Sequence, residues 1–257
     1  QVLKEAMAAG KAPHMKRWLD SGSHKLIGWT SDLSSQSSAA QAGILHGNNR
    51  DIPAFRWYDK TEERVVVSSS TRDVEKLEER VSDGNGLMSN GGVARGSLFS
   101  GDARNVVLTA SRVFDLTSVD LGAYYLNPFG FVRSLWLMLW DIVLEKKSAW
   151  LQRIHDEQPR VNRGGTYFAL RALTTVLVRD VCLATLRSDM FSGTPYAYVT
   201  LGGYDEVSHH SGVRRPDALE IVRKLDREFA KLEGAAAYAR RDYRFVVVSD
   251  HGQSQGV

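Results

Sequence analysis

Polar side chains that can do chemistry lie near the end of this chain, directly after an apolar run. Residues 245–248 are one phenylalanine and three valines, and Asp250 and His251 follow them. Such a run predicts a strand buried on both faces, and ligands of open α/β sheets bind beyond the carboxyl ends of the strands. A carboxylate beside an imidazole can bind a cation such as zinc. We therefore expect Asp250 and His251 to be metal ligands.

A second apolar run, residues 196–201, leads to the same kind of pair. Asp205 and His209 follow it after two glycines. Residues 214–241 separate the two runs and are long enough for a crossover helix, so the strands can be parallel neighbours with their polar ends at one edge. Two such pairs predict two metal ions.

A serine-rich turn over residues 31–38 leads into a small-residue helix that is predicted to end at Gly47. The first turn of a helix has unpaired backbone N–H groups, which favour an anion such as phosphate. Taken alone, serines at this position are more simply helix caps. Together with the two predicted pairs of metal ligands, the serine-rich turn is instead interpreted as a site for phosphate chemistry.

The composition indicates one large α/β domain. The chain has 257 residues, of which 43% are hydrophobic and 25% charged, enough to bury a substantial core. Its 33 basic and 30 acidic residues give a net charge of +3 without a dense basic run, which argues against a nucleic-acid-binding surface. The single cysteine, Cys182, cannot form an intrachain disulfide.

The elements that must position these residues alternate between helices and short strands. Helices are predicted over 1–20, with a break at Gly10 and Pro13, and over 71–82, 167–186 and 216–234. Further strands are predicted at 25–30, 64–68 and 105–110, and loops at 48–60 and 84–96.

Residues 129–144 form the most hydrophobic segment, interrupted by Arg133 and Asp141. The segment is shorter than the roughly 20 apolar residues that a bilayer crossing needs. A buried or partner-contacting helix is favoured over a helix that lies on a membrane surface.

Three motifs in this order resemble the alkaline phosphatase superfamily, in particular its type I phosphodiesterase and nucleotide pyrophosphatase branch. They are the serine turn followed by Gly47, Asp205-x-x-x-His209, and Ser249-Asp250-His251-Gly252. The blocks 41–48, 52–57, 203–212 and 249–254 are similar to a bacterial, membrane-associated subgroup. The resemblance spans most of the chain. It implies an α/β fold with a mostly parallel central sheet flanked by helices, as one alkaline-phosphatase-like domain over 1–257 that is incomplete at both ends.

The resemblance also implies a nucleophile. In that branch a threonine or serine precedes the glycine that ends its helix, and the spacing from Gly47 points to Ser37, with Ser38 and Ser35 as alternatives.

Metal ligands are implied in the same way. Asp205 and His209 resemble the ligands of one ion, with His210 as the alternative to His209, and Asp250 and His251 resemble those of the other. The family pattern also calls for an aspartate before this chain and a histidine after it. Each ion is therefore expected to lack one protein ligand, and the fragment is expected to bind metal weakly.

These features predict a metal-dependent hydrolase of phosphodiester or pyrophosphate bonds that works through a phosphoseryl intermediate on Ser37. A serine hydroxyl is a poor nucleophile at neutral pH, and divalent cations activate it and offset phosphate charge. Mixed imidazole and carboxylate ligands favour zinc, with manganese as the alternative. The alternative function is a non-catalytic interaction domain that retains the fold.

The resemblance bears on partners and location as well. The expected substrate is a small phosphoester, a nucleotide or a lipid headgroup. The fragment itself is expected to be soluble. Flanks outside it are expected to attach the full-length protein to a membrane at the cell envelope.

Overall fold

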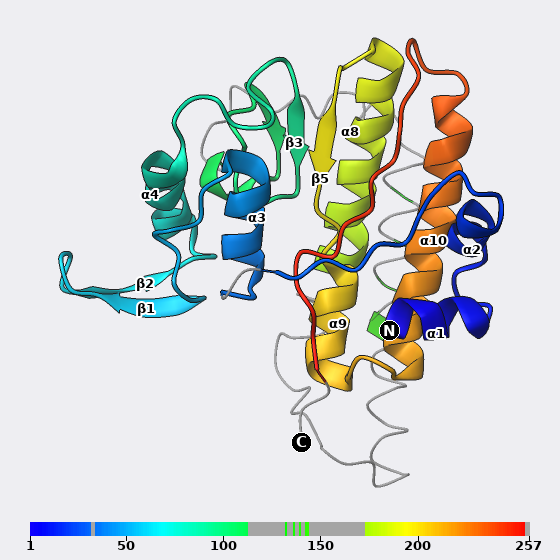
Figure 1. Ribbon diagram of the computed structural model, residues 1–257, viewed down its shortest axis with the longest axis horizontal. Helices are drawn as coiled ribbons and strands as arrows, with labels where there is room; N and C mark the ends of the chain where they lie inside the picture. Colours follow the sequence, from blue (N-terminus) through cyan, green and yellow to red (C-terminus); the bar gives the residue numbers. More distant parts are fainter. Residues whose placement is uncertain are drawn as a thin grey trace, which may run out of the picture.

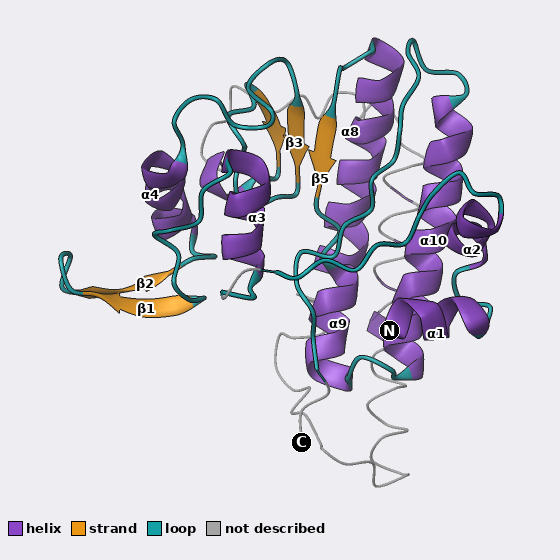
Figure 2. Ribbon diagram, in the orientation of Figure 1, coloured by secondary structure: helices purple, strands orange, loops and turns teal. Residues whose placement is uncertain are grey.

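The structure is a computed structural model that describes residues 1–31, 34–112 and 173–254, together with positions 132, 136, 139, 142 and 143. It is a mixed α/β fold in which a short parallel sheet lies among helices (Figure 1; Figure 2). This confirms the predicted fold class.

A three-stranded parallel sheet has the order β4-β3-β5. Its strands are β3 (Val93–Arg95), β4 (Asn105–Val107) and β5 (Ala197–Val199). The central strand β3 is buried at every position, as expected for a strand covered on both faces. The strands predicted at 105–110 and 196–201 are confirmed as β4 and β5. β3 lies inside the predicted loop 84–96, where the prediction was wrong. Three residues flanked by glycines show no pattern of their own, and pairing with two neighbours makes them a strand.

Helices form most of the rest. They are α1 (Val2–Ala8), α2 (Pro13–Asp20), α3 (Ser37–His46), α4 (Thr71–Val81), α8 (Arg179–Ser192), α9 (Gly203–Ser211) and α10 (Pro216–Ala236), with the π-helical η3 (Leu173–Val178) before α8 and the 3-10 turn η1 (Ala110–Arg112) after β4. The helices predicted over 1–20, 71–82 and 216–234 are confirmed. So is the helix predicted to end at Gly47, whose φ of 67° is the left-handed conformation that glycine adopts at helix ends.

An antiparallel hairpin projects from the α/β body beside α4 (Figure 1). It consists of β1 (Arg56–Asp59) and β2 (Arg64–Val67). β2 agrees with the strand predicted at 64–68. The loop predicted over 48–60 was wrong at β1, because cross-strand pairing with β2 turns four polar and aromatic residues into a strand.

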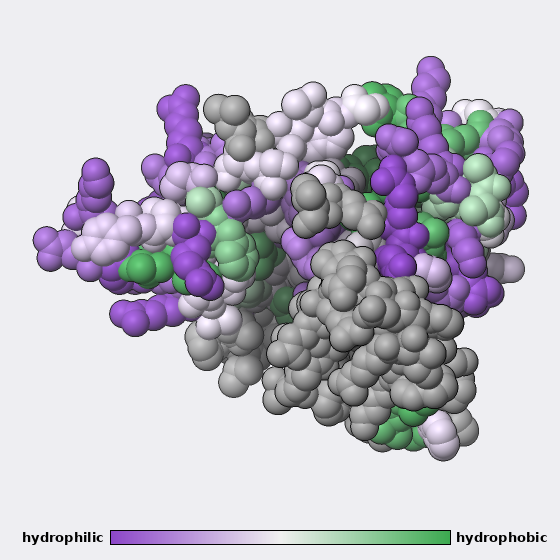
Figure 3. Space-filling view, turned by 90° about the horizontal axis from the view of Figure 1, so that it is seen from below, coloured by the Kyte–Doolittle hydropathy of each residue, from purple (hydrophilic) through white to green (hydrophobic). Residues whose placement is uncertain are grey.

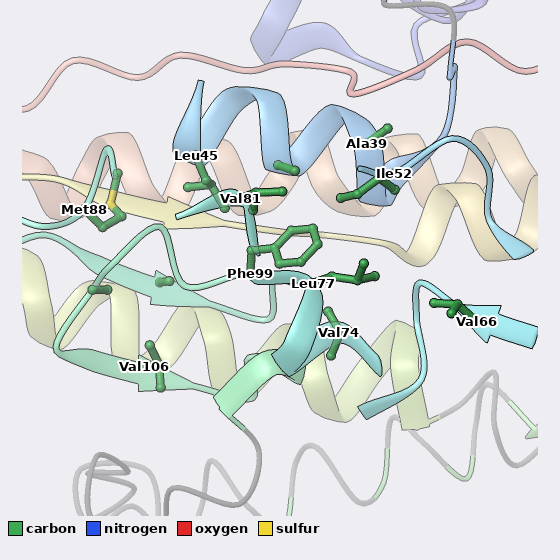
Figure 4. Packing of buried hydrophobic residues seen from close by; sticks show 13 residues of the cluster. Ala39, Leu45, Ile52, Val66, Val74, Leu77, Val81, Met88, Phe99 and Val106 are labelled. Carbon is green, nitrogen blue, oxygen red and sulfur yellow. The ribbon is translucent and has the colours of Figure 1, made fainter. Parts of the chain in front are cut away.

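The main hydrophobic core joins α3, α4, the hairpin and the sheet (Figure 4). Its buried members are Ala39, Ala42, Leu45, Ile52, Val66, Val74, Leu77, Val81, Met88, Ala94, Phe99, Ala103 and Val106. A second cluster packs α1 and α2 on α10 through Met7, Met15, Trp18 and Val222. The first core fixes α3 against the sheet, and the second fixes the N-terminal helices against α10.

A buried ion pair ties the sheet to α8. The guanidinium of Arg95, which is 2% exposed, donates from Nε and Nη2 to the two carboxylate oxygens of Asp189 at 3.0 and 2.9 Å. Its third nitrogen, Nη1, donates to the carbonyl oxygens of Ala94 and Asn105. This pairing accounts for a charged residue in the middle of the sheet, since a buried charge needs a partner.

Two predicted strands were wrong. Residues 25–30 and 245–248 belong to no helix or strand. Ile27 is 75% exposed and Val246 83% exposed, so neither segment is buried as the apolar runs predicted. A β-branched run becomes a strand only when a neighbouring strand pairs with it, and among the described residues the ladder of the parallel sheet ends at β5.

Two further predictions lie partly or largely outside the described residues. The helix predicted over 167–186 is described from Leu173, and it continues to Ser192. Within 129–144, the described positions are helical, and Val132, Trp136, Leu139 and Val143 are exposed. None of the described helices is long and apolar enough to span a bilayer. Hydrophilic side chains cover much of the visible described surface (Figure 3).

Candidate active site

Ser37 is the first residue of α3. The residue before it, Gln36, is extended and gives the helix no side-chain cap, so backbone N–H groups of the first turn are left for other acceptors. Ala39, Ala42 and Leu45 hold the same helix in the main core. The local sequence thus places a hydroxyl at the start of a rigid, firmly packed helix.

His251 meets this hydroxyl from the other end of the chain. Its Nε2 atom lies 2.8 Å from Oγ of Ser37. Its other nitrogen, Nδ1, faces the carbonyl oxygen of Gly252 at 3.2 Å. A carbonyl oxygen can only accept, so the proton belongs on Nδ1 and the hydroxyl of Ser37 donates to Nε2. The structure therefore joins the predicted nucleophile to one predicted metal ligand.

Asp250 stands on the same side of the imidazole as Ser37. Its Oδ1 lies 3.8 Å from Nε2 of His251 and accepts the backbone N–H of that residue at 3.2 Å. In a Ser-His-Asp triad the carboxylate would bond to Nδ1 instead. Here the serine oxygen, the imidazole nitrogen and the carboxylate oxygen converge around Nε2. That arrangement is typical of ligands around a cation and unlike a charge-relay triad.

Asp205 and His209 form the second pair. They are one turn apart in α9, and His209 Nε2 lies 3.4 Å from Asp205 Oδ1, with 60% and 41% of the two side chains exposed. Helix α9 begins shortly after β5, and the i, i+4 spacing brings the two side chains to one helix face.

β5 precedes one pair in the chain and feels the charge of the other. Burial raises the pKa of Tyr198, in the middle of β5, to about 12, and the negative charge of Asp250 adds to this rise. Asp250 is thus close enough to this strand to act on it, and Asp205 follows the same strand in α9. No hydrogen bond or ion pair between the described side chains joins one pair to the other.

The alternative residues occupy different surroundings. Ser35 is exposed and its Oγ accepts from Ser31 at 3.2 Å. Ser38 is 1% exposed, and its hydroxyl has no hydrogen-bond partner among the described residues. The side chain of His210 lies outside the described part. Ser37 is thus the one of the three candidate serines that contacts His251.

A sequence model of the family described as type I phosphodiesterase / nucleotide pyrophosphatase matches residues 3–256. The chain belongs to this family. It is thereby a member of the alkaline phosphatase superfamily and of a family of phosphoester hydrolases. No curated protein and no solved structure matches the chain.

Proteins of the type I phosphodiesterase family typically depend on metal ions, so the donor pairs can be tested for fit. Two ligand atoms about 2.0 to 2.2 Å from one tetrahedral zinc lie about 3.3 to 3.6 Å apart. The 3.4 Å between His209 and Asp205 meets this requirement, and the 3.8 Å between His251 and Asp250 is slightly long. In the described part of the chain, no three His, Cys, Asp or Glu side chains gather around one point. The pairs therefore fit as partial ligand sets.

Sequence reasoning missed two residues near this candidate site. Tyr198 lies on β5 near Asp250, and Trp29 donates from its indole nitrogen to the carbonyl oxygen of Ser249 at 3.1 Å. Both were assigned only to predicted strands. No sequence signal distinguishes Trp29, because the half-exposed state of its side chain appears only in the structure.

Proposed function

We propose that this chain hydrolyses phosphodiester or pyrophosphate bonds, with Ser37 as the nucleophile and two divalent cations as cofactors. The observation that supports the proposal best is the contact between Ser37 and His251, because it joins two motifs 214 residues apart at the end of a helix. Zinc is the cation we propose, and manganese is the second candidate. The substrate we propose is a small phosphoester, a nucleotide or a lipid headgroup.

The chemistry begins at the start of α3. Oγ of Ser37 attacks phosphorus, the bond between phosphorus and the leaving oxygen breaks, and the phosphoryl group is carried on Oγ until water cleaves it. Asp250 with His251, and Asp205 with His209, would hold the two cations, whose positive charge would stabilise the serine alkoxide and offset phosphate charge. In the structure Nε2 of His251 accepts the hydroxyl hydrogen of Ser37, which places the serine oxygen beside the nitrogen that would bind a cation.

Uncapped N–H groups in the first turn of α3 support the same proposal. With no side-chain cap from Gln36, they can donate to phosphoryl oxygens, and the positive end of the helix dipole favours that charge. The anion and the nucleophile thus share one helix end.

The decisive experiment measures hydrolysis of bis(p-nitrophenyl) phosphate by the 257-residue chain with added zinc or manganese. Ser37→Ala should lower the rate at least about a thousandfold, since a covalent nucleophile has no substitute. Ser38→Ala is the matched control and should keep wild-type activity, because its buried hydroxyl has no hydrogen-bond partner in the described part of the chain.

Other outcomes are equally informative. Full activity in Ser37→Ala, with loss of activity in Ser38→Ala or Ser35→Ala, would assign the nucleophile to Ser38 or Ser35 instead. No hydrolysis by any form, with metal bound, would support a non-catalytic interaction domain that retains the fold. Membrane association of the full-length protein and the bacterial subgroup stay predictions.

A further inference from the structure

Trp29 lies on the extended segment between α2 and α3, and half of its side chain is in solvent. It is 52% exposed, and its neighbour Ile27 is 75% exposed, so burial does not explain its position. Its indole N–H instead donates to the carbonyl oxygen of Ser249 at 3.1 Å. This residue directly precedes Asp250 and His251.

Two hydrogen bonds join the same two segments. One is the bond between Trp29 and Ser249, and the other is the bond between Ser37 and His251. Figure 1 shows the blue segment leading to α3, and the red segment crossing in front of α8 before it runs down past α9 toward the C-terminus. Either hydrogen bond holds the two segments together, so the other bond has a shorter loop to close and costs less chain entropy.

Apolar packing gives this part of the chain little support. Phe245 packs against Trp18, but Val246 is 83% exposed, and Val247 and Val248 are also more than half exposed. Phe245 thus packs six positions before His251, whose own side chain is 12% exposed. Inside the loop, Ser249 Oγ donates to the carbonyl oxygen of His251 at 2.7 Å. Restricting the position of Ser249 therefore also restricts the backbone of His251.

We propose that Trp29 is a positioning residue, which fixes the loop of Asp250 and His251 against Ser37 through the carbonyl of Ser249. The expected effect of Trp29 on turnover rests on the proposed function. Its expected effect on the mobility of residues 249–252 does not. Without the indole N–H, the contact between Ser37 and His251 is the remaining side-chain hydrogen bond from residues 249–252 to a distant segment in the described part of the chain. The imidazole then samples more orientations, and fewer of them direct the serine oxygen toward phosphorus.

The test compares Trp29→Phe, which keeps an aromatic ring and removes the N–H, with Ile27→Ala on the same exposed segment. Amide hydrogen exchange of peptides covering 249–254 should accelerate in Trp29→Phe and stay at the wild-type rate in Ile27→Ala. With zinc and bis(p-nitrophenyl) phosphate, kcat should fall about tenfold, equivalent to about 1.4 kcal/mol, the size of one hydrogen bond. KM and the thermal midpoint should stay near wild type, since the side chain is half exposed.

Each result decides something. Unchanged exchange at 249–254 in Trp29→Phe overturns the hold on the loop. Faster exchange with wild-type kcat overturns the positioning role. If the wild-type chain hydrolyses nothing, the exchange experiment still decides the hold on the loop, while that failure counts against the proposed function. A large fall in the thermal midpoint would show that Trp29 supports the fold and would also overturn the proposal.

Discussion

The hydroxyl of Ser37 lies 2.8 Å from Nε2 of His251, although 214 residues separate the two in the chain. The helix that bears Ser37 is held in the main core, whereas His251 lies on a loop outside any strand. Ser37 thus lies on a core-packed helix, whereas His251, with 12% of its side chain exposed, lies on a loop that hydrogen bonds help to hold. This asymmetry determines which substitutions should affect activity and which should affect stability.

Replacing His251 should affect hydrolysis without affecting the fold. His251→Asn removes both the partner of the Ser37 hydroxyl and a proposed metal ligand, so kcat/KM should fall at least about a hundredfold. His24→Asn is the control, because His24 stacks on Trp18 away from this contact and should leave kcat/KM unchanged. Steady-state kinetics with an aryl phosphodiester would measure both. Equal kinetics in the two variants would contradict the proposed site.

Removing divalent cations should abolish hydrolysis reversibly. Dialysis against a chelator should remove activity, and added zinc or manganese should restore it. Calorimetric titration with zinc should show weak binding, since each pair offers two ligands, and Asp205→Asn should weaken it further. Glu206→Gln, on the same helix, should bind zinc like the wild type. Full activity in chelated protein that contains no metal would contradict the cofactor proposal.

Glu78 should make stability depend on pH at the acid end. Burial raises the pKa of this carboxyl, but hydrogen bonds from His46 and Ser100 outweigh it and leave the pKa below its ordinary value. A depressed pKa in the folded state adds stability above the unfolded pKa, near 4.5, and that stability is lost as pH falls through the folded value. Urea unfolding at pH 7 and pH 3 should therefore show a smaller acid loss for Glu78→Gln than for the wild type. An equal loss would show that other carboxyls set the acid limit.

Arg95 should matter to stability more than any exposed basic residue. Arg95→Met leaves the carboxylate of Asp189 without its two-pronged partner, and breaking a buried pair costs about 3 to 5 kcal/mol. Arg104→Met, at an exposed position beside the same sheet, should change the free energy of unfolding by less than about 0.5 kcal/mol. Denaturant unfolding would measure both. A similar small effect in the two would mean that the buried pair adds little.

The helices could be predicted from the sequence because their signals are local. Pro216 and Asp217 mark the start of α10, and Gly47 marks the end of α3, as expected from the sterics of proline and glycine at helix ends. The strands were predicted less well. An apolar run gave β5 correctly and failed at 245–248, because a strand exists only where a neighbour offers its backbone.

The candidate site was predictable in part for a similar reason. The residue types at 205, 209, 250 and 251 indicated metal chemistry, but the choice of Ser37 among neighbouring serines came from family resemblance. Its contact with His251 depends on tertiary structure, and so does the bond between Trp29 and Ser249. The sequences around Ser37 and Trp29 show no pattern that indicates contact with residues 249–251.

The exposed valines at 246–248 also affect how the protein behaves in concentrated solution. An extended, β-branched, uncharged triplet on the surface is a template for the same segment of another molecule. We expect fibrillar self-association to limit the shelf life of this chain before thermal unfolding does, and Val247→Lys should delay it, as thioflavin T fluorescence over days would show. The three valines that the sequence predicted to be buried are thus the first residues to replace when the protein must be kept in concentrated solution.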